Sequence, residues 1–162
     1  MKRSVPLPAP DGPVVVAYDG SPASEIALIE AAALLAPRSA VVVTVWKEGI
    51  GLRAFDHPEH LPPAPLDVRL AGEVDWSIAE RAQRLAEHGA ALAREAGLDA
   101  EGLAVAEEVD VPVPETVVDV AEKRRAAVIA VGTHGHGGAI GTISRGVIRR
   151  ARCPVLVRGP AR

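Results

Sequence analysis

Short, strongly apolar segments alternate with helix-like segments along the chain, and this alternation limits the possible folds more than any other feature. Four of the segments are almost continuously apolar and mostly rich in valine: residues 14–18, 40–46, 126–132 and 154–158. Such runs are typical of strands buried on both faces of a parallel sheet. A fifth segment, residues 102–109, alternates in polarity and carries charge, so we expect it at a sheet edge.

Helices are predicted between these strands. Ser21 is a suitable cap for a helix that has Pro22 at its first position and that ends near Pro37. Its inward face is predicted to be a stripe of Ile26, Ile29, Ala33, Leu34 and Leu35. Three more helices are predicted at residues 73–96, 114–125 and 143–152, and in the second of them Val117, Val120 and Ala121 should face inward. Strands alternating with helices predict an α/β fold: a single doubly wound five-stranded parallel sheet with helices on both faces.

The domain organisation is predicted to be simple. The length of 162 residues indicates one domain, which we place at residues 14–158. Residues 1–13 hold four prolines and should form a disordered lead-in, and residues 159–162 a short tail. Residues 47–72 contain four prolines and three glycines and are expected to form an irregular excursion. A loop of that length is interpreted as either a mobile flap or a cover over a site.

Composition excludes several classes of protein. Aromatic residues make up only 2% of the chain, so the core must be built from valine, leucine, isoleucine and alanine. The net charge of −3 argues against nucleic acid or an anionic membrane as a partner. No apolar run approaches the roughly 20 residues of a membrane helix, and no signal peptide is visible. Cys153 is the single cysteine, which rules out an internal disulfide and favours a reducing cytoplasm.

A run of glycines after the fourth predicted strand is the strongest functional signal. It comprises Gly132, Gly135, Gly137, Gly138, Gly141 and Gly146. Glycines let a backbone approach a ligand closely, and successive N–H groups followed by a helix N-terminus bind phosphate. The alternative is a flexible solvent loop without a ligand. The run matches neither a P-loop nor a dinucleotide-binding fingerprint.

A second signal follows the first strand. If the first and fourth strands are neighbours, the loops after both open onto one crevice at the carboxyl edge of the sheet. Asp19 would then lie beside the crevice, where it could accept hydrogen bonds from a ribose or an adenine amino group. The alternative is that Asp19 only stabilises the turn before the first helix. Val45 and Trp46, at the end of the second strand, would lie near a bound base.

No catalytic site and no metal site are predicted. Ser144 lacks the sequence context of a nucleophile elbow. His134 and His136 are two residues apart, too weak a pattern for a metal site without further ligands. ATP hydrolysis would need a base to position water, and His134 is the single candidate for that role.

Four segments, in order, resemble the universal stress protein family: "VVVAYDGSPASEIAL", "VVVTVW", "VGTHGHGG" and "CPVLV". The resemblance spans roughly residues 14–157 and implies strand order 3-2-1-4-5. It also implies binding of ATP, as in many members, and dimerisation through the last strand, residues 154–158. The positions that match residues around the adenosine in the family are Ala17, Tyr18, Asp19 and, through its backbone, Val45.

The phosphate motif of ATP-binding members, G-x2-G-x9-G-[S/T], is matched only in part. Gly132 and Gly135 match its first two glycines, and His134 lies between them. Nine residues later the chain has Arg145 and Gly146 instead of glycine and a hydroxyl residue, and Val147 follows. Either Gly146 still offers its N–H at the helix start while Arg145 pairs with phosphate, or the Arg145 side chain blocks the phosphate space.

The resemblance therefore predicts a cytoplasmic stress-response protein that works as a nucleotide-dependent regulatory dimer. The expected ligand is ATP, AMP or another adenine nucleotide, with Mg²⁺ as a possible companion, and no nucleic acid or membrane partner is expected. The alternatives are a nucleotide-independent dimeric interaction protein with a degenerate site and a weak ATP hydrolase.

Overall fold

A computed structural model of the chain describes residues 11–47, 68–107, 111–133 and 141–159. Its centre is one five-stranded sheet in which every neighbouring pair of strands is parallel. The strands are β1 (Val14–Ala17), β2 (Ser39–Lys47), β3 (Asp99–Glu107), β4 (Val128–Gly132) and β5 (Val155–Arg158). Their order is β3-β2-β1-β4-β5, so the predicted topology is confirmed, with β1 directly beside β4 and β3 at an edge.

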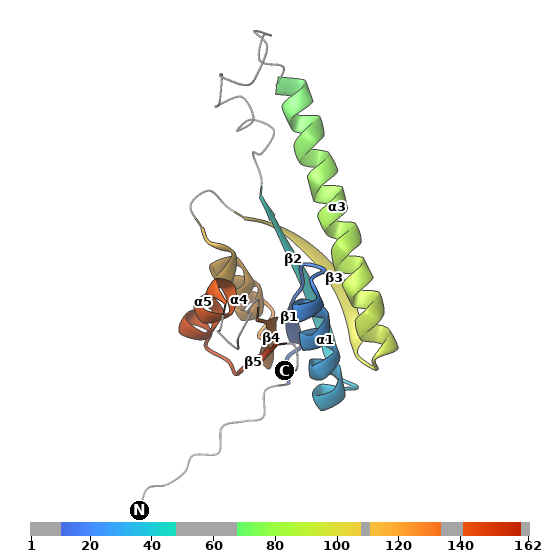
Figure 1. Cartoon of the computed structure of the whole chain (residues 1–162), viewed down its shortest axis with the longest axis vertical. Helices are drawn as coiled ribbons and strands as arrows, with labels where there is room; N and C mark the ends of the chain where they lie inside the picture. Colours follow the sequence, from blue (N-terminus) through green and yellow to red (C-terminus); the bar gives the residue numbers. More distant parts are fainter. Residues whose placement is uncertain (1–10, 48–67, 108–110, 134–140, 160–162) are drawn as a thin grey trace, which may run out of the picture.

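Helices cover both faces of this sheet (Figure 1). They are α1 (Pro22–Leu35), α3 (Val68–Glu95), α4 (Val113–Lys123) and α5 (Thr142–Arg150). Alternate residues of β1 point to opposite faces and define two apolar cores. Val14 and Val16 pack with Leu28 of α1 and Ala90 of α3. On the other face Val15 packs with residues of α4 and α5.

The inward face of α1 is not the predicted one. Ser21 caps the helix as expected, since its Oγ accepts a hydrogen bond from the Ser24 N–H at 3.3 Å. The buried residues are Ala23, Ser24, Ala27, Leu28, Ala31 and Ala32. Ile29 and Leu34, predicted to face inward, are 56% and 63% exposed. The prediction was wrong because α1 has apolar residues on every side, with Glu25 and Glu30 as its charged residues, so periodicity alone could not select a face. The small alanines are the ones that let the helix pack against the sheet.

Two boundaries differ from expectation by three residues or more. Helix α3 begins at Val68, five residues earlier than predicted, so residues 68–72 are helical and do not belong to an irregular excursion. Strand β3 begins at Asp99, three residues earlier than predicted. In α4 the predicted inward residues Val117, Val120 and Ala121 are all buried, which confirms that face. Residues 1–10 and 48–67 of the predicted lead-in and excursion lie outside the described residues.

A search of the described helices for a membrane span found none of sufficient length and apolarity. Cys153 is a half-buried free thiol that packs beside the α4 core. Burial raises the pKa of this thiol above its usual value. The neutral thiol is therefore favoured, and Cys153 packs as a small, half-buried apolar side chain.

Candidate functional site

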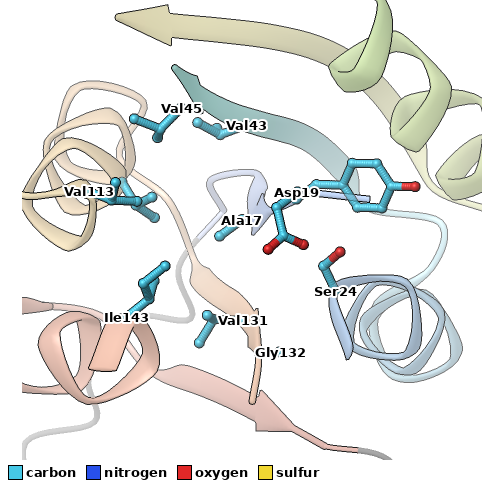
Figure 2. Close-up of a pocket in the computed structure, with 11 residues that line it drawn as sticks. Ala17, Asp19, Ser24, Val43, Val45, Val113, Val131, Gly132 and Ile143 are labelled. Carbon is cyan, nitrogen blue, oxygen red and sulfur yellow. The ribbon is translucent and has the colours of Figure 1, made fainter. Parts of the chain in front are cut away.

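A cavity of about 160 Å³ lies where β1 and β4 end, between the N-terminal turns of α1, α4 and α5. Its lining residues are Ala17, Tyr18, Asp19, Ser24, Val43, Val45, Val113, Val117, Val131, Gly132 and Ile143. Figure 2 shows that Val45, Val113 and Ile143 surround one end of the cavity, while Asp19 and Ser24 lie at the other. The structure thus brings Ala17, Asp19, Val45 and Gly132 together, at the carboxyl ends of adjacent parallel strands.

Ala17, the last residue of β1, and Tyr18, which follows it, lie on opposite faces of the sheet. Ala17 packs on the α4 side, which is the side of the cavity. The Tyr18 ring belongs to the other core, where a Cβ on Gly89 would come within 2.7 Å of it. Its hydroxyl donates to Glu25 Oε1 at 3.4 Å. Desolvation, followed by the nearby Glu25 carboxylate, raises the pKa of Tyr18. The ring therefore holds β1 against α1 and α3, and does not form a wall for a base.

Asp19 stabilises the turn before α1, which is one of the two roles that the sequence left open for this residue. Its Oδ1 accepts a hydrogen bond from the Ser21 N–H at 3.0 Å and so supports the turn into α1. The residue is also exposed and lines the cavity. Both interpretations of Asp19 are compatible with this geometry, because one carboxylate can accept several hydrogen bonds.

The backbone of β2 has an open edge beside the cavity. The carbonyl of Val43 accepts from the Tyr18 N–H at 2.8 Å, so Val43 faces β1. Val45, two residues on, faces the same side, but β1 has already ended at Ala17. Its N–H and C=O have no partner there among the described residues. They form a donor and acceptor pair at the aliphatic end of the cavity.

Gly132 is required for packing. A Cβ on this residue would overlap the carbonyl group of Ala23 and approach the Ser24 nitrogen within 2.8 Å. The close approach that the sequence suggested is therefore between the end of β4 and the first turn of α1. Gly132 therefore holds the end of β4 against the first turn of α1, which carries Ser24 and follows the turn at Asp19.

The N-terminus of α5 lies at Gly141 and Thr142, not at Arg145 and Gly146. Gly141 is the N-cap, makes no side-chain cap, and accepts from the Arg145 N–H at 3.0 Å. Gly146 is therefore in the second turn, where a Cβ would come within 2.6 Å of the Pro114 side chain. Its N–H is not at the helix start as expected, and its absent side chain lets α5 pack against α4.

Arg145 and Val147 also differ from the sequence-based expectation. Arg145 is exposed and does not line the cavity. Val147 is fully buried in the core beneath α4. Neither side chain is placed where it would obstruct the cavity.

The sequence interpretation missed a glycine–hydroxyl pair, Gly141–Thr142, at the start of α5. Five residues separate Gly135 from Gly141, so the pair does not fit the nine-residue spacing. The signal that could have revealed it is the position of Gly-Thr directly before a helical segment. Ile143, the next residue, lines the cavity, which places this helix N-terminus at its rim.

No catalytic or metal-binding arrangement is found in the parts of the chain that the structure describes. Ser144 is buried and its Oγ donates to the Gly141 carbonyl at 3.1 Å. A search of those same residues for groups of histidine, cysteine and acidic side chains suited to a metal found none. His134 and Gly135, predicted to contribute to the site, lie outside the described residues.

A doubly wound parallel sheet with a cavity at the point where strand order reverses defines a class of α/β ligand-binding proteins. The model of the Universal stress protein family matches residues 12–158. The chain therefore belongs to the universal stress protein family, and the predicted resemblance is confirmed. No curated protein sequence matches the chain.

Solved structures of related proteins share this fold. One is a universal stress protein family protein from Burkholderia pseudomallei, with 24% identity, a TM-score of 0.63, and coverage of 90% of this chain and 94% of that one. A second is the universal stress protein from Archaeoglobus fulgidus in complex with dAMP, with 23% identity, a TM-score of 0.61 and coverage of 91% and 97%.

A third is a universal stress protein family protein from Arabidopsis thaliana with AMP bound. It has 15% identity, a TM-score of 0.59 and coverage of 93% of this chain and 92% of that one. Identities this low establish the common fold.

Proposed function

We propose that this protein binds an adenine nucleotide in the cavity between β1, β4, α4 and α5, and that occupancy regulates its interactions as a dimer in the cytoplasm. The observation that carries the proposal is the position of Gly141 and Thr142. A helix N-terminus without a side-chain cap meets the rim of an apolar cavity. This combination suits a ligand with a flat apolar group at one end and phosphate at the other.

The adenine would occupy the aliphatic end of the cavity. Val113, Val117 and Ile143 supply apolar contact there. The open N–H and C=O of Val45 suit the acceptor and donor on the edge of adenine. Asp19, at the polar end, would accept hydrogen bonds from ribose hydroxyls.

The phosphates would lie at the start of α5. The N–H groups of Thr142, Ile143 and Ser144 occupy the first turn and have no acceptor within the helix. The Thr142 hydroxyl adds one more donor. His134 and Gly135 are proposed to complete the phosphate contacts, as the family resemblance implies. Arg145 would act through its charge from outside the cavity, while Gly146 and Val147 support the packing of α5.

The length of the phosphate chain is a separate part of the proposal. Two related proteins were crystallised with dAMP and AMP, which favours a monophosphate as the smallest ligand. ATP would extend two further phosphates past the N-terminus of α5. Mg²⁺ would then be carried mainly by these phosphates, with the Thr142 hydroxyl at the start of α5 as a candidate protein ligand.

Dimerisation is proposed through β5. This strand lies at the sheet edge, and its three apolar residues are only half-buried. Successive residues of a strand direct their backbone groups to alternate sides, so Val155 and Val157 face away from β4. Within the described residues, nothing pairs with those outward groups. An open edge of this kind is a template for pairing with a second copy.

An exposed apolar surface favours a second candidate function, a nucleotide-independent interaction protein. Ile29 and Leu34 of α1 are more than half exposed, so these apolar side chains are available for contact with a partner. This candidate predicts normal assembly with no nucleotide binding.

A calorimetric titration of nucleotide-stripped protein with adenosine, AMP and ATP–Mg²⁺ tests the proposal. Saturable binding of AMP or ATP at micromolar concentration, about −8 kcal/mol, supports it. Binding of all three with equal affinity would remove the phosphate role of α5. No heat with any of them, together with an unchanged melting temperature, would favour the interaction protein.

A further inference from the structure

The two edges of the sheet differ in how their backbone groups are satisfied. At the β3 edge, Ala100, Gly102, Ala104 and Ala106 direct their backbone groups away from β2, because every second residue of a parallel strand faces the same side. Such groups normally remain open to water or to another strand. In this chain, side chains from α3 bind three of them.

Gln83 of α3 binds β3 as a neighbouring strand would. Its Nε2 donates to the Gly102 carbonyl at 3.1 Å, and its Oε1 accepts from the Ala104 N–H at 3.0 Å. A side-chain amide has the same donor and acceptor as a peptide group, so it occupies one complete pairing position on the strand. Arg94 covers the acceptor of the next position by donating from a guanidinium nitrogen to the Ala100 carbonyl at 2.6 Å.

The close approach of α3 to β3 makes these contacts possible. A Cβ on Gly102 would lie 2.6 Å from the backbone of Ala86 and Glu87. Glycine at this position therefore lets the helix backbone lie directly over the edge strand. From there Gln83, about one turn before this contact, and Arg94, about two turns after it, can reach around the edge.

We propose that Gln83 and Arg94 close the β3 edge against pairing with other strands, so that association through sheet edges is restricted to β5. The restriction has a geometric consequence. If both edges were open, β5 of one copy could add to β3 of the next, and this head-to-tail contact would extend without end. With β3 closed, the pairing that remains is β5 with β5, which closes on itself after two copies. The role of the β3 edge holds whether or not β5 pairs in solution.

The test uses Gln83→Met in the full chain. Methionine keeps the length of the side chain and a high helix propensity. It removes both hydrogen bonds to β3, together with the 3.3 Å hydrogen bond from the Gln83 Nε2 to Glu87 Oε1. The matched control is Arg84→Met, because Arg84 is the next residue on α3, its side chain is 67% exposed, and its described contact is an ion pair with Glu80. Two quantities are measured: hydrogen exchange at the Ala104 amide, and molar mass by light scattering over a hundredfold range of concentration.

For Gln83→Met we expect exchange at the Ala104 amide to become about tenfold faster, because its acceptor is lost. The molar mass should rise with concentration above that of the unchanged protein, whereas Arg84→Met should match the unchanged protein in both measurements. If the unchanged protein is a dimer, the variant should form species larger than a dimer. If it is a monomer, the variant should form dimers, and the proposal for β5 would fail while the role of β3 would stand.

Two results would overturn the inference. One is faster exchange at Ala104 with a molar mass that stays equal to that of the unchanged protein at every concentration. The other is an equal rise in mass for Arg84→Met. If Gln83→Met does not fold, Arg94→Met replaces it, because this variant opens the Ala100 carbonyl alone. Arg94→Met should show the same rise in molar mass at higher protein concentration. A constant molar mass for a folded Arg94→Met variant would contradict the inference.

Discussion

Gly132 at the end of β4 lies against Ala23 in the first turn of α1, so closely that a Cβ on Gly132 would overlap the Ala23 carbonyl group. This contact sets the distance between the two loops that border the cavity. Glycine is therefore required for packing at the first position of the predicted phosphate motif, whether or not a ligand binds.

Replacing Gly132 with alanine should therefore destabilise the fold. We expect the free energy of unfolding to fall by about 2 kcal/mol, because the new methyl group forces backbone against backbone. Urea denaturation measures the change. Gly72→Ala is the control: nothing lies within 4 Å of a Cβ at this helical position, so stability should rise by about 0.5–1 kcal/mol. If Gly132→Ala has the same free energy of unfolding as the unchanged protein, the claim that the contact with Ala23 excludes a side chain at this position is wrong.

Thr142→Val should weaken phosphate binding without affecting the nucleoside. Valine has the shape of threonine but lacks the hydroxyl, so we expect roughly tenfold weaker binding of AMP or ATP and unchanged binding of adenosine. Thr142→Ser keeps the hydroxyl and should restore the affinity. Calorimetry with all three ligands distinguishes these outcomes, and an equal loss for adenosine would remove Thr142 from the phosphate site.

Asp19→Asn should distinguish the role of Asp19 in the turn before α1 from its proposed role in nucleotide binding. The asparagine oxygen can still accept from the Ser21 N–H, so the free energy of unfolding should change by less than about 0.5 kcal/mol. The lost charge should weaken nucleotide binding roughly tenfold if the carboxylate contacts ribose. Asp19→Ala should lose both properties. Full affinity in Asp19→Asn would mean that Asp19 serves the turn alone.

Ala17→Ile should fill the cavity and abolish binding of the base. Ala17 lines the cavity from β1, and a β-branched side chain suits a strand. We expect the circular dichroism spectrum to be retained and the affinity for adenosine to fall by at least about tenfold. Undiminished adenosine binding in a folded Ala17→Ile variant would place the base elsewhere.

The stability of the fold should decrease at alkaline pH. Burial and Glu25 raise the pKa of Tyr18 in the folded state, so the folded protein favours the neutral phenol. The contribution of Tyr18 is therefore complete below the unfolded pKa of about 10 and is lost as pH rises toward the folded pKa. Cys153 acts in the same direction at a lower pH. Urea denaturation between pH 8 and 11 should show a shallower decline in Tyr18→Phe; an identical decline would exclude Tyr18 as the cause.

Much of the site could be predicted because its residues follow strands. Asp19 comes after β1, Val45 lies near the end of β2, and Gly132 ends β4. Parallel strands place these positions at one edge of the sheet whatever the details of packing. The phosphate end was harder to predict. The spacing directed attention to Arg145 and Gly146, whereas the start of α5 depends on where the helix meets α4, at the contact between Gly146 and Pro114.

The sequence by itself determined the order of strands and helices, since apolar runs and helix signals are local properties of the chain. It also determined that the core would be aliphatic. Tertiary structure alone decided which side of the alanine-rich helix α1 is buried, which face of the sheet receives Tyr18, and that Gln83 binds the backbone of β3. These outcomes depend on contacts between segments far apart in sequence, and no local pattern encodes the distance at which two elements pack.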